Sequence, residues 1–232
     1  RLASGQVGIV LDGGFFNRGG FYEFKLVGRD GVNVVADAHI APSPVSWSLA
    51  KVSGYRNQAT GSAISSFAQP VVLHPDLRSA PTRLSLATRS LNYGDLVIGE
   101  GAYLGVSPQG SIKLESWAQL TMLGTLEAPA GTVTLSRPAN RAEELYNSDI
   151  IAFSEGKQSE SIFLGADSRI LAGGTTKLDT AARVALDAGL SADALRALYR
   201  YKGEVLAGGS VDVDAGLGYL VMAKGALIDV SG

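Results

Sequence analysis

The sequence predicts an all-β protein that winds as a parallel β-solenoid, a stack of coils built from short strands. Two observations carry this prediction. A glycine-led phrase recurs along the chain, and glycine supplies 29 of the 232 residues, nearly twice its usual share. Internal repetition near 20 residues with glycine punctuation is typical of stacked-coil architectures.

The repeated phrase runs glycine, small hydroxyl residue, apolar residue or threonine, polar, apolar, polar. Its four copies begin at Gly110, Gly131, Gly174 and Gly209. The first two are 131 − 110 = 21 residues apart, which predicts one coil between them. The last two are 209 − 174 = 35 residues apart, which predicts an insertion looped out of the coil.

Apolar and polar residues alternate within each copy, as in a strand with one buried face. Val211 and Val213 therefore point to one side of their strand, and Asp212 and Asp214 to the other. The same reasoning predicts that the following residues point into the core: Ile112, Leu114, Val133, Leu135, Val211, Val213, Ile228 and Val230.

The chain is long enough for one elongated domain, with two parts that differ in regularity. Residues 81–232 carry the repeats, and their clearest succession of short strands covers 94–137. Residues 1–80 read as an irregular, β-rich segment continuous with the solenoid. Strands at 21–27 and 32–38 flank a loop of four residues, a spacing that permits a hairpin.

Two stretches interrupt the strand pattern, at 138–149 and 181–201. Asn140, Thr180 and Ser191 stand where helix caps would stand, so short helical and loop insertions are expected there. The pair of predicted helices in 181–201 resembles a helix-turn-helix. Its leucines are better explained by packing onto the solenoid, so no nucleic-acid partner is expected.

Composition excludes several classes of function. The net charge is −2, which gives no general attraction to nucleic acid or anionic lipid. The absence of cysteine excludes disulfides, thiol nucleophiles and Cys-ligated zinc. No apolar run approaches ~18 residues, so no membrane insertion is expected. The start on Arg1 and the stop on a repeat predict an internal piece of a larger protein.

Candidate chemical motifs have simpler structural explanations. The glycines at 99–105 resemble a dinucleotide fingerprint, but the spacing is one residue too long and no helix follows. Asp212, Asp214 and Asp229 could bind calcium or act as paired carboxylates, yet outward acids are ordinary on strand exteriors. His39 and His74 read as surface or loop residues. We therefore expect no catalytic residues, no metal and no cofactor, and hence no enzyme.

Ligand contact is expected from the irregular parts of the chain instead. A solenoid with a filled core offers no cleft except where insertions fold over a face. Aromatic rings in these parts can stack on sugar rings. The candidate contact residues in and near the insertions are Trp47, Tyr55, Arg196, Tyr199 and Arg200.

Residues 94–137 and 161–232 resemble filamentous-haemagglutinin-like exoproteins of two-partner secretion in Gram-negative bacteria. The resemblance lies in the phrases at 95–102, 124–135 and 225–232, and it covers about half of the chain. It implies a right-handed parallel β-helix, and export through the periplasm and a partner pore in the outer membrane. No Asn-Pro occurs, so the chain lacks the motif of the family's secretion domain.

The resemblance also implies a function. We expect a secreted or cell-surface structural and adhesive module that mediates attachment or biofilm formation by meeting a host or bacterial receptor or glycan. The alternative is a β-helical carbohydrate-binding or polysaccharide-degrading protein, because sugar-cleaving enzymes also use this fold.

Overall fold

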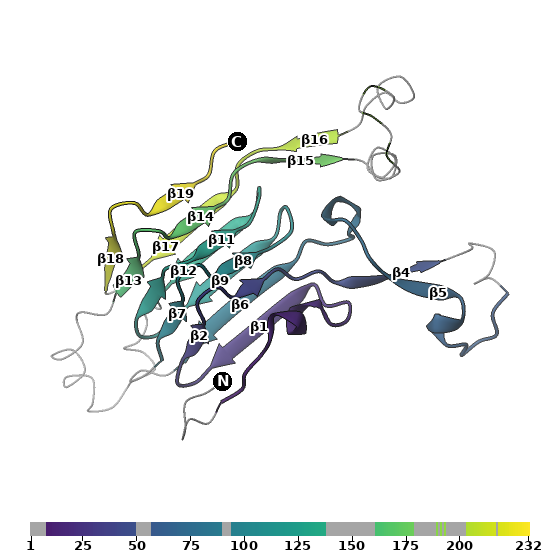
Figure 1. The fold of residues 1–232 in the computed structure, drawn as a ribbon, viewed down its shortest axis with the longest axis horizontal. Coiled ribbons are helices and arrows are strands. Elements are labelled where there is room, and N and C mark those ends of the chain that lie inside the picture. Colours follow the sequence, from purple (N-terminus) through teal and green to yellow (C-terminus); the bar gives the residue numbers. More distant parts are fainter. Residues whose placement is uncertain are drawn as a thin grey trace.

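The structure is a computed structural model that describes residues 8–49, 57–89, 94–137, 161–178, 189, 191, 193, 203–216 and 218–232. Three parallel sheets of five strands each form the walls of a solenoid with five coils (Figure 1). The parallel β-solenoid predicted from the repeats is therefore confirmed.

Each coil contributes one strand to each sheet. The first sheet contains β1 (Glu23–Gly28), β6 (Arg83–Thr88), β9 (Ser111–Glu115), β12 (Thr132–Ser136) and β17 (Ser210–Asp214). The second contains β2 (Val32–Val34), β7 (Leu96–Ile98), β10 (Leu120–Met122), β13 (Ser161–Leu164) and β18 (Tyr219–Met222). The third contains β3 (His39–Ile40), β8 (Tyr103–Gly105), β11 (Thr125–Glu127), β14 (Arg169–Leu171) and β19 (Leu227–Asp229).

Like residues stack in register between coils and fill the core. Val133 pairs with Ile112 on one side and Val211 on the other, so their side chains form one apolar row. Four predicted core residues are fully buried: Ile112, Leu114, Val133 and Leu135. Three more are partly buried against the core: Val211, Val213 and Ile228.

The prediction for Val230 is wrong, because this side chain is 47% exposed. Val230 lies one residue beyond the end of β19, the last strand of the third sheet. No described strand stacks on that side of the last coil, so alternation alone does not bury the side chain.

A column of glycines at the corner before the first sheet explains the repeated phrase. Gly110, Gly131 and Gly209 each precede a strand of that sheet. A Cβ atom on Gly131 would lie 2.3 Å from the carbonyl oxygen of Gly110, and one on Gly209 would lie 1.9 Å from that of Gly131. Only glycine lets successive coils approach this closely.

The copy at Gly174 is not a rung of the first sheet. Its strand, β15 (Thr175–Leu178), pairs antiparallel with β16 (Gly203–Leu206) outside the three walls. The repeated phrase is compatible with a strand of a two-stranded ribbon as well as with a coil strand, because side chains alternate between the two faces in both.

The hairpin expected between 21–27 and 32–38 is also wrong. β1 pairs with β6 and β2 pairs with β7, so the two segments lie in different sheets of the first coil. Gly28 and Gly31 therefore turn a solenoid corner. The hairpin of this part of the chain is formed by β4 (Val45–Leu49) and β5 (Ala68–Val72).

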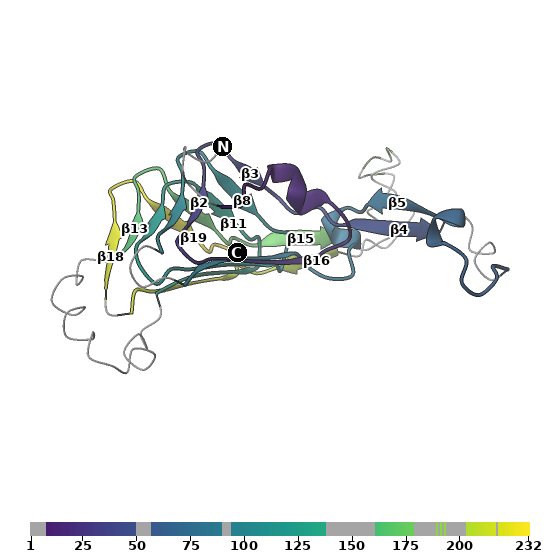
Figure 2. The same cartoon turned by 90° about the horizontal axis from the view of Figure 1, so that it is seen from below.

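Two ribbons project from the same side of the solenoid (Figures 1 and 2). We call β4–β5 the first arm and β15–β16 the second arm. Both interrupt the connection from the third sheet to the first, which elsewhere is a tight turn. Short 3-10 helices η2 (Ile64–Ser66) and η3 (Pro75–Leu77) flank β5.

The start of the solenoid is covered by the 3-10 helix η1 (Gly13–Asn17). Phe16 is 4% exposed and packs edge-on against Phe24 of β1, with ring centroids 5.2 Å apart. Phe15 also meets Phe24 edge-on, at 6.2 Å. This aromatic cluster closes the apolar interior of the first coil.

The predicted insertion at 138–149 lies outside the described residues. So does that at 181–201, except for Gly189, Ser191 and Asp193. Their helical character stays a prediction. Among the described residues, no helix has the length and hydropathy needed to cross a membrane.

Candidate functional site

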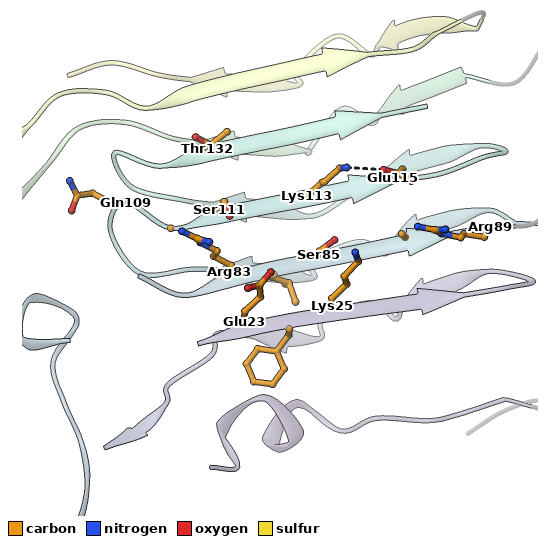
Figure 3. A pocket seen from close by; sticks show the side chains of 14 residues that line it. Glu23, Lys25, Arg83, Ser85, Arg89, Gln109, Ser111, Lys113, Glu115 and Thr132 are labelled. Atoms are coloured by element: carbon orange, nitrogen blue, oxygen red, sulfur yellow. Dashed lines mark ion pairs between the residues drawn. The ribbon is translucent and has the colours of Figure 1, made fainter. Parts of the chain in front are cut away.

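The outer face of the first sheet carries a shallow hollow of about 520 Å³, which we call the charged hollow (Figure 3). Side chains from β1, β6, β9 and β12 line it, together with flanking turns. Those that Figure 3 labels are Glu23, Lys25, Arg83, Ser85, Arg89, Gln109, Ser111, Lys113, Glu115 and Thr132.

The strand alternation that fills the core also builds this face. Phe24 and Leu84 point inward, so their neighbours in the strand point outward. Strand register then sets these neighbours in rows across the coils. One row is Lys25, Ser85, Lys113, Thr134 and Asp212.

A parallel row starts at Glu23 and continues through Arg83, Ser111 and Thr132. Arg89 follows the end of β6. The charges are unevenly distributed, because the cations lie on the first three coils whereas Asp212 and Asp214 lie on β17 of the last coil.

The cations of the hollow differ in their pairing. Lys113 Nζ lies 2.8 Å from Glu115 Oε2 in an ion pair. No ion pair among the described residues engages Lys25, Arg83 or Arg89. All three are exposed. The hollow therefore presents positive charge that is available to a ligand.

The first arm carries Trp47, the predicted contact residue that the structure describes. Cross-strand pairing places Val45 opposite Val72, and Trp47 opposite Pro70, on one face of the ribbon. Trp47 is 47% exposed and Val72 is 57% exposed. This apolar face projects away from the coils and can contact a partner.

The other predicted contact residues, Tyr55, Arg196, Tyr199 and Arg200, lie outside the described residues.

Each arm also forms a hydrogen bond outside its own ribbon. The Tyr22 hydroxyl forms a 3.3 Å hydrogen bond with Ser46 Oγ of β4, and this bond lowers the pKa of Tyr22 below its usual value. In the second arm, the Leu178 N–H donates to Asp76 Oδ2 of η3 at 3.4 Å. The first bond links the first arm to the residue before β1, and the second links the second arm to η3, in the segment between β5 and β6.

Each of the two histidines has a local partner. His39 is exposed and stacks on Tyr103, with ring centroids 4.7 Å apart. His74 Nδ1 accepts a 3.3 Å hydrogen bond from the N–H of Asp76. Among the described residues, no group of three or more histidine, aspartate or glutamate side chains could hold a metal ion.

Tyr103 has the most perturbed pKa of the described groups, and its role is structural. Its hydroxyl donates to Glu127 Oε2 at 2.7 Å. Burial and this bond raise the pKa of Tyr103 well above its usual value. The ring lies over Gly105, where a Cβ atom would come within 2.5 Å of the tyrosine oxygen. The three residues pack the outer face of the third sheet.

Two of the acids considered for calcium binding or catalysis, Asp214 and Asp229, accept hydrogen bonds in local turns. Asp214 Oδ1 accepts from the Gly216 N–H at 2.8 Å, and Asp229 Oδ1 from the Ser231 N–H at 2.9 Å. Hydrogen bonds with Ser231 lower the pKa of Asp229. Asp229 lies in the third sheet and Asp214 in the first, so these two acids do not converge.

Comparison of the chain with protein-family models, with curated proteins and with solved structures finds no match. The geometry of the chain itself must therefore support any function assigned to it.

Sequence reasoning did not single out the residues of the charged hollow. The hairpin that the sequence permits would pair the strand of Lys25 with 32–38, and the repeat stacks the strand of Lys113 on the next copy of the phrase, so neither prediction brings these lysines to Arg83. The missing signal was the register between coils. Aligning 23–28, 83–88 and 111–115 as successive rungs would have placed these cations together.

Proposed function

We propose that this protein is a structural and adhesive module of a large secreted bacterial surface protein of the filamentous-haemagglutinin-like type. In this proposal, the parent protein crosses the outer membrane through a partner pore and supports attachment or biofilm formation. The solenoid acts as a rigid spacer, and elements outside the coils make the contacts.

The observation that carries the proposal is the pair of arms on a continuous stack of coils. Stacked parallel strands make a stiff body in which each coil contacts only its neighbours. An isolated two-stranded ribbon is marginally stable in water, so an exposed apolar face on the first arm favours a binding role. Trp47 and Val72 supply that face, and tryptophan is enriched among residues that dominate binding energy.

A substitution on the first arm tests the adhesive role. Beads coated with the protein should attach to epithelial cells or to bacteria, and Trp47→Ser should lower attachment several-fold. Tyr219→Ser is the matched control, because Tyr219 is also an exposed aromatic residue, at 65%, but lies on β18. Equal attachment by the wild type and Trp47→Ser, or an equal loss in Tyr219→Ser, would contradict a role for the arm.

A second candidate function, carbohydrate binding, is favoured by the charged hollow. The hollow is polar and lies along a flat sheet face, as a binding surface for an extended polymer would. Polysaccharide degradation would need a convergent acid pair, and Glu115 is instead paired with Lys113. Incubation with polysaccharides should therefore release no shorter products.

A further inference from the structure

The cations of the charged hollow follow a spacing set by the coils. Lys25 and Lys113 occupy the same row on β1 and β9, with Ser85 of β6 between them. Neighbouring strands lie about 4.8 Å apart, so the two lysines recur at roughly twice that distance along the solenoid axis. Thr134 continues the row, which therefore alternates cation and hydroxyl over four coils.

Two arginines flank this row on the middle strand. Arg83 begins β6, and Arg89 follows its last residue, so one lies on each side of Ser85. The hollow therefore has a central row of lysines with an arginine at either edge (Figure 3). Lys25 and both arginines are unpaired among the described residues and are free to meet an anion.

This arrangement is complementary to a ligand that is extended, anionic and rich in hydroxyl groups. The cations can form charge-assisted hydrogen bonds with carboxylates. Ser85 and Ser111 can exchange hydrogen bonds with neutral hydroxyls, and Glu23 can accept them. A linear polysaccharide with acidic sugars has both kinds of group along one chain.

Nucleic acid fits the hollow less well. Single strands are usually held by aromatic side chains on which the bases stack. Phe24 is the aromatic residue of the lining, and it points into the core. Glu23 and Glu115 lie among the cations and would repel a closely spaced row of phosphates.

We propose that the charged hollow binds a linear acidic polysaccharide lying across the strands, along the solenoid axis, with its carboxylates at Lys25 and the flanking arginines. This proposal rests on the second candidate function and names the class of carbohydrate, and it is separate from the adhesive role of the arms, because no arm residue lines the hollow.

Titration calorimetry on the full chain tests the site with two acidic probes, hyaluronan and alginate oligosaccharides. Dextran serves as the neutral probe. Lys25→Gln combined with Arg83→Gln removes two unpaired cations, so no described carboxylate loses an ion-pair partner. Arg169→Gln is the matched control, because Arg169 is an exposed cation on β14 in the third sheet. Thermal unfolding should confirm that both variants fold.

At least one acidic probe should bind the wild type, more weakly as salt is raised, since ions screen exposed charges. The double variant should bind that probe roughly tenfold more weakly or worse, because each charge-assisted hydrogen bond contributes substantially. Arg169→Gln should bind as the wild type does.

Three results would overturn the proposal. The first is no binding of either acidic probe, and the second is binding of dextran with equal affinity. The third is unchanged affinity in the double variant. Tighter binding of single-stranded DNA than of either acidic probe would assign the hollow to nucleic acid instead. The double variant leaves Trp47 intact, so it should still attach to cells. The proposal for the hollow and the proposal for the arm can therefore be contradicted independently.

Discussion

The two ends of the solenoid carry the same apolar pattern with different outcomes. In the first coil, η1 covers the interior, and Phe24, Val34 and Ile40 are at most 8% exposed. In the last coil, Leu220 is 45% exposed and Met222 is 46% exposed. Their partners in register one coil earlier, Ile162 and Leu164, are buried.

The difference teaches that burial in this fold comes from the neighbouring coil as well as from the strand itself. A residue in an interior coil is covered on both sides along the axis, whereas one in the last coil has a described neighbour on one side. Stability in such a stack is approximately a sum over nearest-neighbour contacts. The same substitution should therefore cost most in the middle coils.

The largest effect is expected from a buried charge in the middle of the stack. Leu114 is fully buried between coils, so Leu114→Asp would bury an unpaired carboxylate and should abolish cooperative folding. Val213→Asp, in the same row two coils later, should fold with a loss of about 1–3 kcal/mol, because Val213 is partly exposed. Urea denaturation measures both. A greater loss from Val213→Asp than from Leu114→Asp would contradict the comparison.

A smaller but still large effect is expected at the cap. Phe16→Ala should lower the free energy of unfolding by about 3–5 kcal/mol, as buried phenylalanines generally do. Leu227→Ala, on the last coil where Leu227 is 43% exposed, should cost less than about 1.5 kcal/mol. Similar losses in the two variants would show that η1 does not protect the first coil.

The uncovered end should also govern self-association. Exposed strand edges and apolar patches favour contact between molecules. Leu220→Lys should therefore move any association seen in sedimentation velocity to higher protein concentration, with little loss of stability. Val27→Lys is the matched control, because Val27 is 48% exposed but lies on β1 at the covered end. An equal shift in both variants would place the contact elsewhere.

The smallest effect is expected for one hydrogen bond in a covered coil. Tyr103→Phe removes the bond to Glu127 and should cost about 1 kcal/mol. The pKa of Tyr103 is raised in the folded chain, so the unfolded chain loses this proton first as pH rises. The free energy of unfolding of the wild type should therefore fall above about pH 10. That of Tyr103→Phe should fall less over the same pH range.

Much of the solenoid was predictable where the chain winds without interruption. Ser111 and Thr132 pair in register 21 residues apart, as the glycine spacing indicates. The first coil was not predictable in the same way, because Gly28 and Gly31 suit a hairpin loop as well as a coil corner. The choice between these depends on β6, whose sequence lies beyond an inserted arm.

The candidate sites show the same limit. Trp47 could be selected because an exposed aromatic residue in an irregular segment stands out in the sequence. Arg83 and Lys25 come together only through pairing between β1 and β6, and the intervening arm hides that register. Single outward charges on strands are common, so only their stacking identifies a site.

Hydrogen exchange of the full chain tests most directly the claim that covering on both sides stabilises each coil. Amides of β9–β12 should exchange slowest, and those of β1 and β3, which η1 contacts, should exchange nearly as slowly. Amides of β18 and β19 should exchange fastest among the coil strands, because one edge of each has no described strand partner and their apolar side chains are exposed. Equal protection of the last and the middle coils would contradict the account.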